Sequence, residues 1–584
     1  MGNLLIALAK IFMKKKKQLP IETISKLSAQ TPNFPQGGGF ATGTIDLGGL
    51  QVCQVSTFNK IWATNQGGPD NLGATFYEPS SIPEGFFVLG HYGQCNNKPF
   101  FGWVLAGKPD ENDPSSLAMP TDYSLIWSSE SQKIKQDNNG YIWLPTAPEG
   151  YKAVGYVIKQ DNNGYIWLPT APEGYKAVGY VVTASPEKPS LERIHCVRSD
   201  LTEVIEFDRW IWGLKSEIDP NGLNVYGSRP KDRGAQAMGV STGSFLVQNI
   251  SGSADVSLPC CLKNTKNSLL AMPNLSQIEA LVQAYSPIIY FHPDEKYLPS
   301  TVKWFFQNGA LLYQKGQEST PSPIEPDGSN LPQGGSDDGL YWLDLPIDDS
   351  AKERVKKGDL DNANAYFHVK PMFGATFTDI AIWVFYPFNG PARAKLEFIN
   401  VSLGKIGQHV GDWEHLTLRV SNFDGSLKCV YFSEHSGGTL LDASQIDFEK
   451  ENKPVAYASL NGHAFYSKPG LVLQGNGRNG IRNDTAKGKA VMDTGVRAEV
   501  IAAEYLTNVV VEPPWLNYTR KWGPKLTYDI ANEIEKVKKV LPGRLKETFQ
   551  KVINGVPNEV LGEEGPSGPK MKNSWNGDEK YQIT

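Results

Sequence analysis

The sequence lacks the features that identify several large protein classes. Its six cysteines in 584 residues form no CxxC pair, which argues against a disulfide scaffold and against zinc bound through cysteine. No apolar run is long enough to cross a bilayer. A net charge of −5 gives no basic surplus for binding nucleic acid. No nucleophile elbow, P-loop, dinucleotide fingerprint or HExxH motif is present, so none of these common enzyme classes is indicated.

The N-terminus does not read as a secretion signal. The mostly apolar residues 4–13 precede four lysines, Lys14 to Lys17, whereas a signal peptide places its basic residues first. This order is typical of a disordered tail, or of a segment that touches an anionic membrane surface weakly. Gly2 follows Met1, but Ile6 stands where N-myristoylation needs Ser or Thr. We expect a cytoplasmic protein, with peripheral membrane contact as the alternative.

The residue types that are abundant in this chain favour β structure. Aromatic residues make up 11% of it, and its 57 glycines and 40 prolines are typical of short strands joined by turns. Residues 134–157 and 158–181 are the same 24 residues, an exact copy that indicates a recent duplication or an assembly artefact. Apart from that copy, three similar units lie at 76–90, 143–155 and 225–239, each with an aromatic strand, a proline turn and a strand that ends at Gly.

These patterns predict a mainly β fold, with an N-terminal β-prism-like domain, a C-terminal β-sandwich and peripheral helices. The predicted segments are a flexible basic tail (1–34), the prism-like domain (35–250), a linker (251–270), a sandwich with a candidate cation site (271–518), a helical segment (519–554) and a mobile polar tail (555–584). Proline and glycine turns recur in any β-rich domain, so an ordinary β domain is the alternative to the prism.

Residues 407–415, Gly-Gln-His-Val-Gly-Asp-Trp-Glu-His, are the most informative stretch. Two of the chain's 8 histidines flank two carboxylates here. Side chains alternate between the faces of a strand, so Asp412 and Glu414 share the buried face of Leu416. Buried carboxylates need a compensating cation, and oxygen ligands with one imidazole suit calcium or magnesium. The alternative is an exposed strand end with solvated acids and a structural Trp413.

Other residues are candidates for supporting roles or for contacts with a ligand headgroup. His463 and His435, with its neighbour Glu434, follow turn signals and would come near Asp412 in a sandwich. The alternative for each is a structural or surface histidine. Arg478 and Arg482 lie in a Gly/Asn-rich loop and would contact an anionic headgroup, unless the loop is an ordinary turn.

The segment His292-Pro293-Asp294-Glu295 offers a second, weaker acidic site through His292, Asp294 and Glu295. A turn in which Asp294 caps the next element is the alternative.

Four segments together resemble one family. They are His292-Pro293-Asp294-Glu295, residues 411–415, the run Phe-Tyr-Ser-Lys-Pro-Gly at 465–470, and residues 37–49 with Phe40 and Asp46. The sequence is similar there to the plant group named vacuolar protein sorting-associated protein sixty-two, also catalogued as a domain of unknown function. Members of the group carry one copy of the 24-residue unit, whereas this chain carries two.

The stretch Gln408-His409-Val410-Gly411-Asp412-Trp413-Glu414 also resembles the Gly-His-Arg-His-Asp-Trp-Glu heptapeptide of necrosis- and ethylene-inducing-peptide-like cytolysins. The resemblance implies a divalent-cation site at one end of a β-sandwich that engages sphingolipid headgroups. His409, Asp412 and Glu414 would then be metal ligands or support them, and Asn389 would stand where the family has a further acidic ligand. Gly411 replaces the second histidine.

The main functional hypothesis is a non-catalytic protein that binds a membrane lipid or glycolipid headgroup through a calcium or magnesium ion, linked to vacuolar trafficking or defence. A metal-dependent hydrolase using His409, Asp412, Glu414 and His463 is one alternative. A trafficking scaffold without a metal is the other. No nucleic-acid partner is expected.

Overall fold

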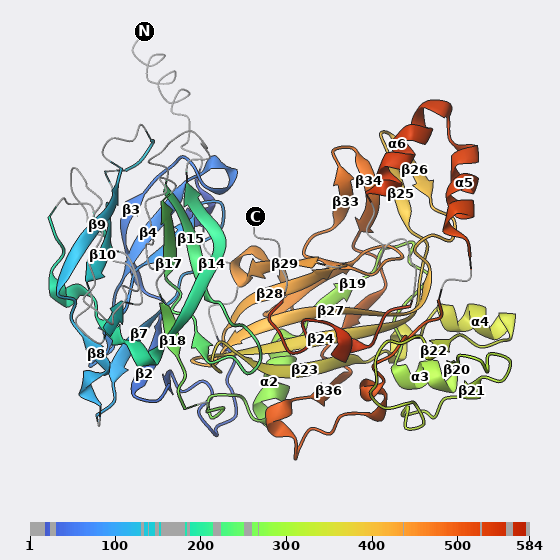
Figure 1. Ribbon diagram of the computed structural model, residues 1–584, viewed down its shortest axis with the longest axis horizontal. Helices are drawn as coiled ribbons and strands as arrows, with labels where there is room; N and C mark the ends of the chain where they lie inside the picture. Colours follow the sequence, from blue (N-terminus) through green and yellow to red (C-terminus); the bar gives the residue numbers. More distant parts are fainter. Residues whose placement is uncertain are drawn as a thin grey trace, which may run out of the picture.

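The computed structural model describes residues 18–23, 31–111, 113–129, 134–137, 139, 141–146, 151–153, 181–183, 187–213, 223–249, 260–266, 268–435, 437–525, 528–555 and 565–579. Two β-rich parts lie side by side, the N-terminal part at the left of Figure 1 and the C-terminal part at the right. The helices within the described residues lie at the periphery, and the predicted mainly β fold class is confirmed. None of these helices is long and apolar enough to cross a bilayer.

Three similar sheets build the N-terminal part. They consist of β3 (Phe58–Ala63), β4 (Ala74–Pro79) and β6 (Tyr92–Cys95); of β9 (Asp122–Ser128), β10 (Tyr141–Thr146) and β12 (Val181–Thr183); and of β14 (Thr202–Gly213), β15 (Leu223–Pro230) and β17 (Phe245–Asn249). The three units recognised in the sequence include residues of β4, β10 and β15, one in each sheet. Most of the second copy at 158–181 lies outside the described residues, as do residues 1–17 with their apolar stretch and four lysines.

One tryptophan from each of these sheets meets the other two at the centre. The ring centroids of Trp62, Trp127 and Trp212 are 5.9, 5.5 and 5.4 Å apart. Each tryptophan follows an isoleucine at which the strand register shifts by one residue, so three equivalent β-bulges surround the centre. This approximate threefold arrangement gives the N-terminal part its prism-like character.

Shorter strands complete the N-terminal part. They are β1 (Thr44–Asp46), β2 (Leu50–Val55), β5 (Phe87–Val88), β7 (Val104–Pro109), β8 (Leu117–Ala118), β11 (Tyr151–Ala153), β13 (Cys196–Arg198), β16 (Gly239–Val240) and β18 (Cys260–Lys263). β18 falls within the predicted linker 251–270 but pairs with β14 and β16, so the linker prediction is wrong there. Within the predicted flexible tail, Ile21 is buried in a short 3-10 turn.

A six-stranded sheet forms the centre of the C-terminal part. Its order is β29 (Gly437–Asp442), β28 (Leu427–Glu434), β27 (His409–Ser421), β24 (Phe377–Asn389), β23 (Ala365–Met372) and β36 (Ala498–Ala502). Both faces of this sheet are buried. One face packs Leu416, Leu418 and Val420 against helix α2 (Leu275–Tyr285), which Asn274 caps.

A second sheet covers that same face and completes the sandwich. It contains β19 (Ile288–Tyr290), β30 (Phe448–Glu449), β31 (Lys453–Ala458), β32 (Phe465–Tyr466) and β35 (Val491–Asp493). The opposite face of the six-stranded sheet packs Trp383, Phe385 and Trp413 against α3 (Val302–Gln307) and several aromatic residues near the C-terminus. Near α3 lie β20 (Leu311–Gln314), β21 (Ser322–Pro323), β22 (Tyr341–Asp344) and α4 (Asp349–Lys356) (Figure 1).

A small sheet lies beside the end of the sandwich at which β27 begins (Figure 1). It contains β25 (Arg393–Leu396), β26 (Ile399–Ser402), β33 (Gly470–Asn476) and β34 (Asn479–Thr485), and helices α5 (Ile530–Val540) and α6 (Gly543–Asn554) pack on it. The helices separate at Leu541 and Pro542, because proline cannot continue the hydrogen-bond pattern of α5.

Residues 565–579 are packed in the structure, although their polar sequence predicts a mobile tail. Trp575 is 4% exposed and stacks on His368 with ring centroids 3.8 Å apart. The N–H of Asp578 donates to the carbonyl of Arg233 at 2.8 Å, which ties this segment to the N-terminal part. The prediction of a mobile tail is therefore wrong for these residues, whose polar side chains have partners in the fold.

Candidate functional site

Strand β27 places the two predicted carboxylates at the end of the sheet. In its antiparallel pairing with β24, Asp412 lies opposite Tyr386 and Glu414 opposite Val384. Both carboxylates stand on the face that continues into buried Leu416, as the alternation predicts. Asp412 and Glu414 are each 7% exposed, so their charges lie in a poorly solvated environment.

Gly411 has a structural reason to replace the second histidine of the heptapeptide. Its φ of 65° is left-handed, and a Cβ atom there would lie 2.5 Å from the carbonyl oxygen of Trp522. Any larger residue would strain the strand and collide with the backbone that covers it. A histidine is therefore incompatible with this position.

His463 supplies the positive charge beside Asp412. Its Nδ1 lies 2.8 Å from Oδ2 of Asp412, and its ring stacks on Tyr386 with centroids 3.9 Å apart and an interplanar angle of 3°. Burial alone would lower the pKa of His463, but the carboxylates of Asp412 and Glu295 outweigh it and raise the pKa to about 9. His463 is therefore a buried imidazolium at neutral pH.

Glu295 lies on the other side of the same imidazole. Its Oε2 is 3.9 Å from Nε2 of His463 and accepts the N–H of Asn461 at 2.6 Å. Burial would raise the pKa of Glu295, but His463 and the backbone donors hold it below the ordinary value. The predicted second acidic site does not form, since Asp294 is 79% exposed and its contact at 3.8 Å is with His292. Glu295 instead supports the first site.

The same imidazolium keeps Asp412 ionised while Glu414 is left without an equivalent partner. Burial would raise the pKa of Asp412, but the hydrogen bond to His463 and the nearby His409 hold it below its ordinary value. For Glu414, burial and the negative charge of Asp412 raise the pKa well above the ordinary value. Its Oε2 accepts a hydrogen bond from Ser433 at 3.2 Å. Glu414 is the group in this site that would gain most from an added cation.

His409 and Asn389 lie opposite each other at the ends of β27 and β24. Nδ1 of His409 is 2.8 Å from the carbonyl of Gly411, and burial lowers the pKa of this histidine. The amide nitrogen of Asn389 donates to the carbonyl of Gly407 at 2.6 Å. Because these contacts use one polar atom of each side chain, the second imidazole nitrogen and the amide oxygen are left as donor atoms for a ligand.

All four predicted metal ligands line one cavity of about 580 Å³, together with two of the predicted supporting residues. The lining includes Asn389, His409, Asp412, Glu414, His435 and Arg482. His435 contacts Asn483 at 2.9 Å, and Arg482 donates to Asp484 at 2.8 Å. Arg478 is exposed on the β33–β34 hairpin, and Glu434 is half-buried at the end of β28. Neither is part of the cavity lining.

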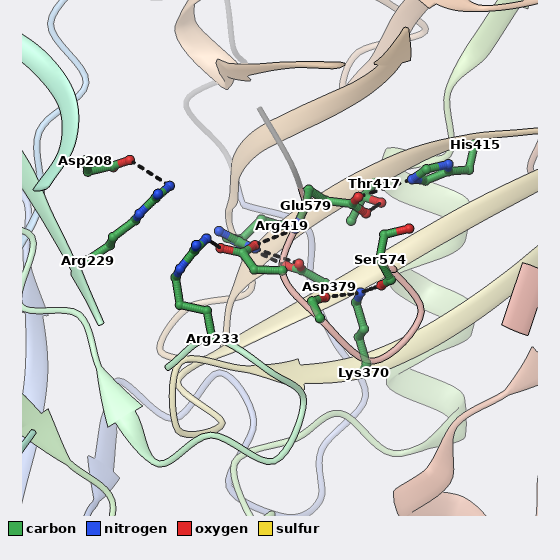
Figure 2. Close-up of polar contacts among 12 residues, drawn as sticks. Asp208, Arg229, Arg233, Lys370, Asp379, His415, Thr417, Arg419, Ser574 and Glu579 are labelled. Atoms are coloured by element: carbon green, nitrogen blue, oxygen red, sulfur yellow. Dashed lines mark hydrogen bonds and ion pairs between the residues drawn. The ribbon is translucent and has the colours of Figure 1, made fainter. Parts of the chain in front are cut away.

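The C-terminal segment supplies a cavity wall that could not be predicted from the sequence. Lys572 and Glu579 belong to the lining, and the positive charge of Lys572 acts on both Asp412 and Glu414. Glu579 lies 3.2 Å from Nε2 of His415 and accepts a hydrogen bond from Thr417, as Figure 2 shows. The polar residues of this segment carry no sequence pattern that predicts a place in the cavity wall, because they meet their partners only in the folded chain.

The four predicted ligands in the cavity offer two carboxylates, an amide oxygen and an imidazole, donor types that fit a hard divalent cation. Within the described residues, however, no three His, Cys, Asp or Glu side chains are grouped closely enough to form a metal centre. Protein atoms alone do not complete a coordination shell here, and a bound cation would need ligands from water or from a bound molecule.

The chain belongs to the family of Vacuolar protein sorting-associated protein 62, because the family model matches residues 21–163 and 157–579. Each matched segment contains one complete copy of the 24-residue unit, as expected if the family carries a single copy. The Saccharomyces cerevisiae protein of the same name is 27% identical over 218 residues, which are 32% of this chain and 44% of that protein. The match thus spans less than half of that relative.

Solved structures with some similarity include GNIP1Aa from Chromobacterium piscinae, at 16% identity and a TM-score of 0.25 over 40% of both chains. NLPPya in complex with glucosamine is 13% identical, with a TM-score of 0.20 over 32% of this chain and 67% of that one. TM-scores this low do not define a shared fold.

Proposed function

We propose that the protein binds a hydroxyl-bearing lipid headgroup, such as that of a glycolipid, in the cavity at the end of β27. The headgroup would be held through a calcium or magnesium ion and without chemical turnover. The observation that carries the proposal is the joint placement of Asn389, His409, Asp412 and Glu414 on one cavity wall. The family name relates the chain to vacuolar protein sorting, which is the setting we propose for this recognition.

The size and lining of the cavity support a small polar ligand. Its volume of about 580 Å³ lies in the range of ordinary ligand sites, about 300–1,000 Å³. Carboxylates, amides and Arg482 can bond to sugar hydroxyls, while Trp413 and Tyr431 contribute apolar surface. This mixture suits a headgroup better than a purely apolar molecule.

The charge distribution supports a bridging cation. His463 balances Asp412, whereas burial and the negative charge of Asp412 raise the pKa of Glu414 well above its ordinary value. A divalent ion would stabilise the ionised Glu414, with Asp412, Asn389 and His409 as further donors. Magnesium commonly binds through one or two carboxylates and keeps several waters, so headgroup hydroxyls can complete its shell.

The position of His463 favours binding over the hydrolase alternative in which it acts on a substrate. A general base has to reach the proton it removes, directly or through one water. The His463 side chain is fully buried behind Asp412 and is not part of the cavity lining. Its contacts make it a positioning residue that fixes the Asp412 carboxylate.

Isothermal titration calorimetry with calcium and with magnesium tests the cation. We expect binding heat in the wild type and in Glu434→Gln, a control on the neighbouring strand outside the lining. Glu414→Gln should bind at least about tenfold more weakly, since even a partner that only orients a metal ligand is worth that much. Equal affinity in all three proteins would refute the cation site. Turnover of phosphodiesters or esters that is lost in Glu414→Gln would contradict the non-catalytic role.

A further inference from the structure

A second cavity lies between the N-terminal and C-terminal parts. Its volume is about 350 Å³, and its wall draws on β14 and β15 of one part and on β27, β28 and β29 of the other. Five cationic side chains and two carboxylates line it, namely Lys98, Arg209, Arg229, Arg419, Lys428, Asp208 and Asp442. Interfaces between domains are frequent places for small-molecule sites, and this volume lies at the lower end of their usual range.

The strand that provides much of this wall departs from the threefold pattern of the N-terminal part. All three sheets share the bulge that precedes their central tryptophan. In the described pairings of these strands, β14 alone has a second register shift, between Phe207 and Trp210. Asp208, Arg209, Trp210 and Ile211 then all line the cavity, although successive residues of a regular strand face opposite sides. Bulges that re-aim side chains are frequent next to binding sites.

The cations of the wall are held in place by carboxylates that mostly lie outside the lining. Arg419 donates to both oxygens of Asp379 at 2.8 and 2.7 Å and also contacts Asp578. Arg229 donates to Glu206 at 2.9 Å and lies 3.4 Å from Asp208 (Figure 2). These carboxylates fix the guanidinium groups in position. The wall itself still carries more cations than carboxylates. Rigid guanidinium groups suit planar or tetrahedral oxyanions.

The other three cations of the wall are Lys98, Arg209 and Lys428. Asp442 contacts Lys98 and, at 3.5 Å, also Arg209. Lys428 is 13% exposed, and its carboxylate contact in the described chain is Asp424, 3.9 Å away and itself 47% exposed. Burial lowers the pKa of Lys428. An ammonium group in this position would gain from an anion placed beside it.

We propose that this interdomain cavity is a binding site for a small phosphate monoester, contacted by Arg209 of the N-terminal part and Lys428 of the C-terminal part. Such a ligand would bridge the two parts. The phosphate could come from a soluble molecule or from a lipid headgroup of phosphatidic acid type, which share this chemistry. The site is separate from the cavity at the end of β27, so either site can be refuted without the other.

Calorimetric titration of the full chain with glycerol 3-phosphate tests the site, and co-sedimentation with phosphatidylcholine vesicles, with and without phosphatidic acid, tests the lipid source. We expect Arg209→Gln and Lys428→Met to bind about tenfold more weakly or worse, the effect of losing one charge-assisted hydrogen bond. Lys303→Met, on the exposed side of α3 and outside both cavities, is the matched control. Binding only to the vesicles with phosphatidic acid would assign the lipid as the source.

The wild-type titrations are decisive even if a variant fails to fold, which circular dichroism would reveal. Absence of binding to both glycerol 3-phosphate and the phosphatidic acid vesicles overturns the proposal. Equal loss of affinity in Lys303→Met overturns it as well. Citrate binding as tightly as glycerol 3-phosphate would show a general anion site and contradict the phosphate assignment.

Discussion

At the scale of single residues, the site depends on how buried charges are balanced. Asp412 is ionised because His463 lies between it and Glu295, and Tyr386 holds the imidazole ring in place. Removing one member of a buried ion pair leaves an uncompensated charge, which is more costly than never having formed the pair. The three charged residues should therefore respond to pH and to mutation as a unit.

The raised pKa of His463 predicts a loss of stability at alkaline pH. The folded pKa of about 9 exceeds the ordinary value of 6.5, so the contribution is complete below about pH 6.5 and disappears as the pH rises through 9. The loss should be on the order of 3 kcal/mol. Urea unfolding of the wild type and of His463→Gln between pH 6 and about 9.5 measures it. The same pH dependence in both proteins would be incompatible with a buried imidazolium.

The two carboxylates should differ in their response to neutralisation. Asp412→Asn leaves the imidazolium of His463 poorly paired and should cost about 3 kcal/mol of unfolding free energy. Glu414→Gln should preserve stability or increase it above about pH 5, because a raised folded pKa means that ionised Glu414 destabilises the fold. Urea unfolding in the presence of a chelator at pH 7 compares the two variants. If Glu414→Gln lost more unfolding free energy than Asp412→Asn, the pairing of Asp412 with His463 would not be the main charge balance of the site.

Much of this residue-level picture follows from the sequence, but the partners do not. Strand alternation places Asp412 and Glu414 on one face, and the heptapeptide draws attention to His409. Nothing local links Asp412 to His463, which is 51 positions away, or to Glu295. Pairings of this kind depend on how loops cross the end of the sandwich, and neither spacing nor periodicity encodes that.

At the scale of elements, the duplicated unit can be compared with the strands it joins. The first copy supplies β10 and β11, whereas β12 begins at Val181, the last residue of the second copy. In β12, Val182 pairs with Ile142 and Thr183 with Tyr141. Removing residues 158–181 would place Val157 directly before Val182 and restore the same local sequence.

Deletion of 158–181 should therefore leave the fold intact. It shortens the connection between Ala153 and β12 from 27 residues to 3 and keeps the residues directly before Val182 the same in sequence. We expect an unchanged circular dichroism spectrum and a melting temperature equal to or above that of the full chain. A substantially lower melting temperature would mean that the second copy contributes contacts of its own.

The packing of the C-terminal segment could not be predicted from its composition. Residues 565–579 are polar and rich in turn formers, yet Asp578 buries its carboxylate against Arg419. Glu579 likewise buries its carboxylate against His415 and Thr417 (Figure 2). A sequence pattern recognises apolar burial well, whereas charged groups that become buried by pairing have no periodic signal. The fold class could be predicted, because the patterns that mark strands and turns are local in the sequence.

Trp575→Ala should therefore be strongly destabilising. The indole is buried and stacks on His368, so its loss creates a cavity and should cost about 3–5 kcal/mol. Met571→Ala in the same segment is the control, since Met571 is 42% exposed and its loss should change stability by no more than about 0.5 kcal/mol. Urea unfolding measures both. Similar small effects would indicate that the segment is loosely attached.

At the scale of the whole molecule, polar contacts join the two parts. Lys98 reaches Asp442, Ser421 donates to Gln54 at 2.7 Å, and Arg233 donates to Asp578 at 3.0 Å. The C-terminal segment thus touches both the N-terminal part and the cavity at the end of β27. Headgroup recognition in that cavity would depend on the assembled chain rather than on the sandwich alone.

The most direct test of the central claim is flotation of the full chain with glycolipid-containing liposomes. We expect flotation with calcium or magnesium, its loss after chelation, and its loss in Glu414→Gln but not in Glu434→Gln. Flotation that persists in Glu414→Gln or after chelation, or no flotation under any of these conditions, would contradict headgroup binding through a cation at Glu414.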